Sequence, residues 1–203
     1  KNNHALYYMY NDTISKTRYI FLDTQDVPYT MDENGKLIYG GQWLFTLSQS
    51  QVDWLVNCAL SFEESGWSVM LFGHSILLPS ELNDGGKFRE NLGILHKIIN
   101  AFKNREKANF DFGSGDFLRT VNVDFSRTEK ADVIGFFVGD YHCDEIEYEN
   151  GIPYILTANA VMYFSEDPKY NIRYDGDKSE VLFDVITIDK QKRKVFITRV
   201  GAG

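Results

Sequence analysis

The chain is poor in cysteine and contains no long apolar run. Only Cys58 and Cys143 are present among 203 residues, which excludes the disulfide framework that holds many small secreted domains together. No apolar stretch approaches the ~20 residues that a membrane-spanning helix needs. The formal net charge of −8 argues against a nucleic acid or a membrane as a partner held by bulk electrostatics.

The composition is that of a globular chain. Apolar residues make up 43% of the sequence and aromatic residues 15%, which is enough for one large core. No repeat, low-complexity tract or linker divides the sequence, so we expect residues 1–203 to form a single domain. Strand-like segments at both ends enclose central helix and strand units. This order predicts a mixed α/β fold with two packed β-sheets flanked by helices.

The periodicity of apolar residues places the expected elements. We expect strands at 5–10, 17–23, 67–72, 117–125, 133–138, 152–157, 181–188 and 194–200, with hairpins formed by the first two and by the last two. One helix should begin after Ser48, which forms a capping box with Gln51, and end at Gly66. A second helix should span roughly residues 87–107, and His96 is expected on its surface.

Two of the expected strands end abruptly in glycine and a potential metal ligand. The first runs into Gly73-His74 and the second into Gly139-Asp140-Tyr141-His142. Such apolar runs are typical of strands buried on both faces of a parallel sheet. Polar residues just beyond their carboxyl ends lie where open α/β sheets bind ligands. We therefore expect His74, Asp140 and His142 to converge; the alternative is two core strands that polar residues follow by coincidence.

This order of motifs resembles the C-terminal half of the calcineurin-like metallophosphoesterases, which carry a lone His after one strand and Gly-His-x-His after the next. Residues 18–24, 41–43 and 48–55 are similar to the branch found among bacterial and prophage proteins. The chain departs from the family in having Asp140 at the first His of that motif. It also lacks the N-terminal motifs Asp-x-His, Gly-Asp-x-x-Asp and Gly-Asn-His-Asp/Glu. The resemblance, over roughly residues 5–200, implies a four-layer sandwich without its N-terminal part.

The resemblance further implies a hydrolase, a phosphatase acting on phosphoester substrates with two divalent metal ions. His74 and Asp140 would bind one ion and His142 the other, while Asp144 would orient a ligating histidine. Imidazole and carboxylate ligands suit Mn, Fe, Zn or Mg, and a carboxylate at Asp140 favours Mn or Mg. An upstream segment of the same polypeptide would complete the site. Cys143 is either a soft metal ligand or, more commonly for such a residue, a small packing residue.

Other interpretations of the sequence stay open. The missing motifs and Asp140 favour a non-catalytic structural or binding module descended from the same fold, for example in a phage particle. Independently of the resemblance, the clustered residues Tyr7, Tyr8, Tyr10 and Tyr19 suggest a carbohydrate- or protein-binding β-rich domain. The expected location is the bacterial cytoplasm or a phage particle.

Overall fold

The computed structural model describes residues 5–40, 43–82, 89–158, 160 and 173–202. Its central element is a six-stranded sheet in the order β1-β2-β3-β6-β8-β7. The strands of this sheet are β1 (Tyr8–Asp12), β2 (Thr17–Leu22), β3 (Trp67–Gly73), β6 (Ala131–Val138), β7 (Glu145–Glu149) and β8 (Ile152–Leu156). The inner strands β2, β3, β6 and β8 run parallel, while β1 and β7 are antiparallel edge strands.

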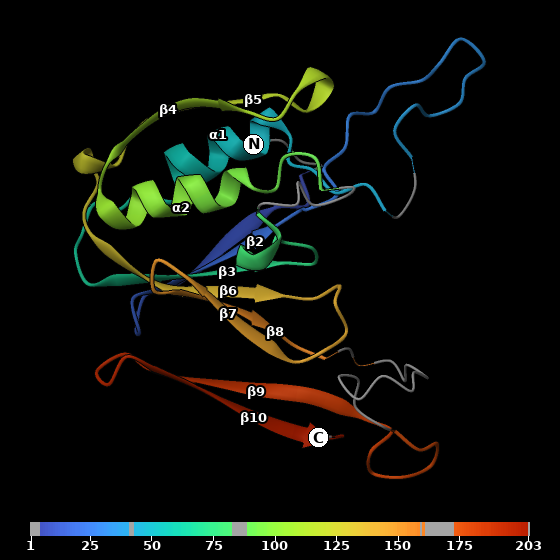
Figure 1. Cartoon of the computed structure of the whole chain (residues 1–203). Helices are drawn as coiled ribbons and strands as arrows, with labels where there is room; N and C mark the ends of the chain where they lie inside the picture. The colour runs from blue at the N-terminus through green and yellow to red at the C-terminus, as the bar shows by residue number, and fades with distance from the viewer. Residues whose placement is uncertain (1–4, 41–42, 83–88, 159, 161–172, 203) are drawn as a thin grey trace.

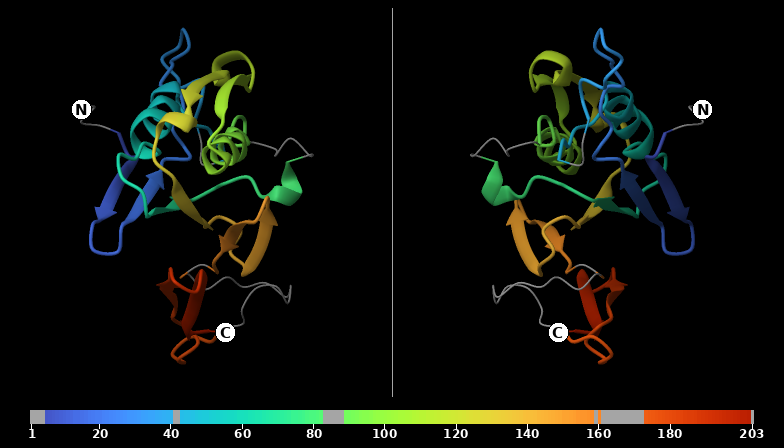
Figure 2. Two further views of the ribbon diagram at one scale, coloured as in Figure 1. Left: turned by 90° about the vertical axis from the view of Figure 1, so that its left-hand side faces the viewer. Right: turned by 90° about the vertical axis from the view of Figure 1, so that its right-hand side faces the viewer.

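Helices and two hairpins lie on either side of this sheet (Figures 1 and 2). The helices α1 (Gln49–Trp54) and α2 (Ile94–Asn104) cover one face, and a π-helical turn, Leu55–Ala59, continues α1. The hairpin of β4 (Lys107–Phe112) and β5 (Arg119–Asp124) lies beyond the helices. The hairpin of β9 (Leu182–Asp189) and β10 (Lys194–Gly201) lies against the opposite face. The mixed α/β class is confirmed.

Single 3-10 turns, all in connecting segments, complete the described elements at Pro79–Glu81, Gly115–Phe117 and Phe125–Arg127. No helix in the part of the chain that the structure describes has the length and apolar character needed to cross a membrane.

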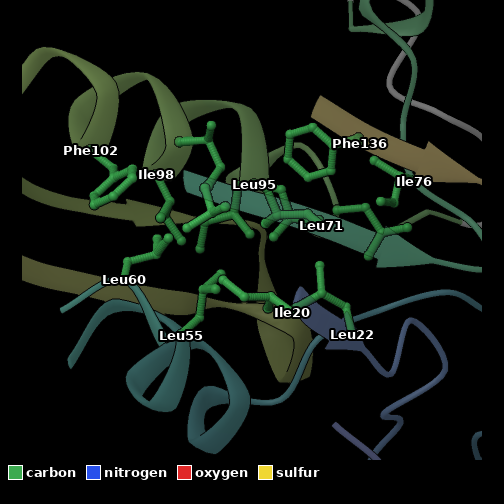
Figure 3. Close-up of a cluster of buried hydrophobic side chains, with 14 of the residues drawn as sticks. Ile20, Leu22, Leu55, Leu60, Leu71, Ile76, Leu95, Ile98, Phe102 and Phe136 are labelled. Carbon is green, nitrogen blue, oxygen red and sulfur yellow. The ribbon is translucent and has the colours of Figure 1, made fainter. Parts of the chain in front are cut away.

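The main core fills the space between the sheet and the helices (Figure 3). Ile20, Leu71 and Phe136 project from neighbouring strands and are fully buried. Leu55 from the turn after α1 and Leu95 from α2 pack against them. Burial of each such side chain stabilises the fold by about 1.5–3 kcal/mol. The apolar face of α2 therefore packs in the core.

A smaller apolar layer joins the opposite face of the sheet to the β9–β10 hairpin. Met70, Phe137 and Ile155 of the sheet are buried there, and Ile186 and Val195 of the hairpin pack against them. Two packed sheets were expected from the sequence, and these two are packed face to face.

A polar clamp reinforces the contact between the hairpin and the sheet. The Arg199 guanidinium on β10 donates to Asp184 on β9 at 2.8 Å. It also donates to Asp144, which precedes β7, at 2.6 Å. We call Arg199, Asp144 and Asp184 the hairpin clamp.

Several predicted element boundaries are wrong. The second helix begins at Ile94, although the chain segment 83–88 at its predicted start lies outside the described residues. It ends at Asn104 because Arg105 adopts a left-handed conformation with φ of 59°, after which the chain enters β4. His96, expected on the helix surface, is only 3% exposed. Cys58, which lies within the predicted first helix, is exposed.

The start of the first helix is confirmed, but its capping box is not. The Ser48 side chain accepts a hydrogen bond from the Gln51 amide at 3.1 Å, as an N-cap does. The Gln51 side chain does not reach back to Ser48; it is buried and exchanges two hydrogen bonds with the backbone of Asp23. Gln51 therefore ties α1 to the end of β2. The helix ends with the turn at Ala59, earlier than the predicted Gly66.

Candidate functional site

The carboxyl ends of β3 and β6 lie side by side, as the sequence predicts. The two strands pair in parallel, with Gly73 opposite Val138. The residues that follow are therefore delivered to one edge of the sheet. There His74 Nε2 lies 3.6 Å from a carboxylate oxygen of Asp140. The Gly139 amide donates to the His74 carbonyl at 3.1 Å, which holds the two connections together.

Arg89 completes this cluster, and sequence reasoning did not identify it. Its Nη2 lies 3.0 Å from the second carboxylate oxygen of Asp140. Its Nε donates to the Ser75 hydroxyl at 2.9 Å, and Nη1 lies 3.6 Å from Glu81. A β-bridge between residues 89 and 45 fixes its backbone. We call His74, Asp140 and Arg89 the edge cluster.

The turn after β6 is conformationally unusual. Asp140 and His142 have left-handed backbones, with φ of 61° and 58°. Few residues other than glycine adopt this conformation, although Asp and His do so more readily than most. A Cβ atom at Gly139 would lie 3.1 Å from His74 Nδ1, so a larger residue there would make the His74 ring shift slightly. Backbone strain of this kind is found preferentially at functional sites.

Burial raises the pKa values of two side chains near the edge cluster. The pKa of Tyr141 is raised well above its usual value by burial and by its hydrogen bond to Glu81. The Tyr141 ring also lies 5.0 Å from the Arg89 guanidinium carbon, as in a cation–π contact. Burial likewise raises the pKa of Asp23, which directly follows β2 at the same edge. Asp23 could have been selected from the sequence, since it also follows a buried parallel strand.

The edge cluster offers part of a metal-binding donor set. His74 presents an imidazole with 61% of its side chain exposed, and Asp140 presents a carboxylate with 13% exposed. Both are ligands for Mn, Fe or Zn. Within the described ranges, however, no group of three His, Cys, Asp or Glu side chains is arranged to hold a metal ion, so His142 does not complete the predicted set. The Arg89 guanidinium also pairs with Asp140, so a bound metal ion would have to displace Arg89 or share the Asp140 carboxylate with it.

Asp144 lies in a different setting from the one predicted. Its carboxylate belongs to the hairpin clamp with Arg199 and accepts a hydrogen bond from the Ala158 amide at 3.0 Å. These contacts give Asp144 a structural role that the sequence did not indicate. Its predicted role beside a ligating histidine stays a prediction.

A shallow hollow lies beside His74, between the sheet and β9. Its volume is about 340 Å³, and its walls include Phe21, Phe72, Phe137 and Ile186. Phe72 stacks on Phe137 with ring centroids 5.1 Å apart. The edge cluster therefore lies next to an aromatic surface.

Comparisons of the sequence with protein-family models and with curated proteins, and of the chain with solved structures, give no match.

Proposed function

We propose that this chain supplies part of the active site of a metal-dependent phosphoester hydrolase with a calcineurin-like fold. The observation that carries the proposal is the approach of His74 to Asp140, 3.6 Å apart, at the carboxyl ends of two neighbouring parallel strands. The left-handed turn containing Asp140 and His142 is compatible with it, because such backbone occurs at functional sites as well as at ordinary helix ends such as Arg105. The packing of the β9–β10 hairpin against the main sheet is compatible with a sandwich fold.

His74 and Asp140 would hold one divalent ion, and His142, which forms no three-residue group with them among the described residues, would bind the second. Bound ions of this kind activate water and neutralise phosphoryl oxygens. Asp140 would contribute a carboxylate oxygen, and a bound ion would compete for that carboxylate with the Arg89 guanidinium that donates to it. The remaining ligands would come from an upstream segment of the same polypeptide, in a bacterial cytoplasm or a phage particle. The chain alone should therefore hydrolyse nitrophenyl phosphate at a rate near background.

Metal binding tests the proposal directly. We expect the chain to bind Mn²⁺ weakly and Asp140→Asn to weaken this binding about tenfold, since loss of one interaction in a metal site commonly costs 10–100-fold. His74→Ala and His142→Ala should have similar effects. Electron paramagnetic resonance of free Mn²⁺ measures the affinity. Asp111→Asn, which changes an exposed carboxylate on β4, is the matched control. Equal affinities of wild type, Asp140→Asn and Asp111→Asn would overturn the proposal.

A second candidate function, a non-catalytic structural or binding module of the same ancestry, is favoured by the ion pair of Arg89 with Asp140. Both side chains are largely buried, and the guanidinium remains charged at every physiological pH. A permanent cation beside Asp140 can replace a metal ion as its electrostatic partner.

The variant Arg89→Met distinguishes the two candidates. If Asp140 is a working ligand, removal of the competing guanidinium should raise Mn²⁺ affinity by about tenfold while the fold persists. If the ion pair is structural, Arg89→Met should not bind Mn²⁺. It should also lose about 2–3 kcal/mol of stability, because it leaves a largely buried carboxylate without its cation. Calorimetric titration and urea unfolding of the same preparation measure both quantities.

A further inference from the structure

A second cavity lies between the two sheets, at the opposite end of the strands from the edge cluster. Its volume is about 380 Å³, and it is bounded by Ser68 and Asp132, near the amino ends of β3 and β6. The apolar side chains that line it include Ile134, Ile155, Ile188 and Val195. Its size falls within the range of pockets that bind small organic molecules. Neither the edge cluster nor the hairpin clamp contributes to it.

The cavity results from incomplete cover of the sheet. The two-stranded β9–β10 hairpin packs on the middle of a six-stranded sheet, so strand β7 extends beyond it. Ile146 and Tyr148 of β7 line the cavity and remain 50% and 68% exposed. Strand β6 also contains a bulge beside the cavity. Val133 pairs with Val69 and Gly135 pairs with Met70, so Ile134 is an extra residue between the two pairs. The cavity therefore opens beside β7.

The rim of the cavity is positively charged, although the chain as a whole carries a net charge of −8. Lys190 and Arg193 of the β9–β10 turn and Lys194 at the start of β10 line it, together with Asp132 and Asp189. Arg193 lies 3.1 Å from Asp132 at the mouth. Asp189 is paired with Lys192 at 3.3 Å.

The two lysines of the rim differ in their availability. Lys190 donates to three backbone carbonyls, those of Ser15, Lys16 and Gly66, and is therefore occupied. Across the described part of the chain, Lys194 forms no ion pair. Lys194 is thus the cation of the rim best placed to receive an anion from outside.

We propose that this cavity binds a small amphipathic anion, an alkyl carboxylate whose chain lies between the sheets and whose head group meets Lys194. The apolar walls match the chain, and the cationic rim matches the carboxylate. This site does not depend on the proposed phosphoester hydrolysis, since it shares no residue with the edge cluster.

Methyl NMR with octanoate tests the proposal, because isoleucines line both the cavity and the separate helix-side core. The δ1 methyl resonances of Ile134, Ile155 and Ile188 should shift and saturate on titration, while those of Ile20 and Ile98 should not. Octanol, which has the same chain without the charge, should bind at least fivefold more weakly. Equal binding of octanol and octanoate would overturn the assignment of the anion, and shifts spread over all isoleucines would overturn the site.

Charge reversal at the rim provides the second measurement. Lys194→Glu should weaken octanoate binding at least fivefold and leave octanol binding unchanged, because only the carboxylate meets the new charge. Lys107→Glu, on the distant β4 strand, changes the net charge equally and should leave both affinities unchanged. An equal loss in the two variants would assign the effect to net charge and overturn the proposed site.

Discussion

Replacing His96 by leucine is expected to lower the free energy of unfolding by about 3 kcal/mol, because several polar groups would lose a buried partner at once. His96 Nε2 donates to the Leu77 carbonyl at 2.6 Å. On the other side of the ring, Nδ1 contacts the Glu149 carboxylate and lies 2.8 Å from the Tyr154 hydroxyl. The ring also stacks on Tyr154 with centroids 4.7 Å apart. His96 thus joins α2, the loop after β3 and the β7–β8 hairpin.

Urea unfolding measures this loss, and His74→Leu is a matched control. The His74 side chain is 61% exposed, so its replacement should change stability by less than about 0.5 kcal/mol. A similar small change for His96→Leu would show that water or the surrounding side chains replace the lost hydrogen bonds.

Replacing Arg199 by methionine is expected to loosen the β9–β10 hairpin before the rest of the molecule. The Asp184 side chain is only 6% exposed and would be left as an uncompensated charge. Removal of one partner from a buried ion pair typically costs 3–5 kcal/mol, and the partial exposure of Arg199 reduces this to about 3 kcal/mol. Amide hydrogen exchange in β9 and β10 should therefore accelerate about 100-fold.

The expected acceleration should be local to the hairpin. Exchange in β3 and β6 should change much less, because their hydrogen bonds lie in the main sheet. Arg127→Met removes an arginine that is 83% exposed in its ion pair with Asp124, and should leave hairpin exchange unchanged. Uniform acceleration in every strand would show that the hairpin and the sheet open as one unit.

The sequence predicts the inner strands well because their signal is local. Buried parallel strands such as β3 and β6 appear in the sequence as uninterrupted apolar runs. Their position next to each other follows from the helix that connects them. The edge strand β7 was missed, although the order Glu145-Ile146-Glu147-Tyr148-Glu149 alternates as a half-exposed strand should. The sequence does not predict β4, because the expected helix extends to residue 107 and the glycines that follow Phe112 indicate a turn before the next strand.

The contacts of polar side chains could not be predicted in the same way. The burial of His96 depends on Glu149 and Tyr154, more than fifty residues away in the sequence. The pairing of Arg89 with Asp140 depends likewise on the path of the loop after β3. The rule that open parallel sheets bind ligands beyond the carboxyl ends of their strands identifies His74 and Asp140. It does not predict which side chains from the loops contact them.

The parallel arrangement of the inner strands also determines how this chain must fold. Thr17 pairs with Ser68, and Trp67 pairs with Ala131, so each pairing closes a long loop before its hydrogen bonds form. The hairpins β1–β2, β4–β5, β7–β8 and β9–β10 need no such closure and can form within microseconds. Assembly of the central sheet should then limit the rate, on a timescale of about milliseconds to seconds. During that interval the apolar strands β3 and β6 have unpaired edges, and the chain is most exposed to association with other copies of itself.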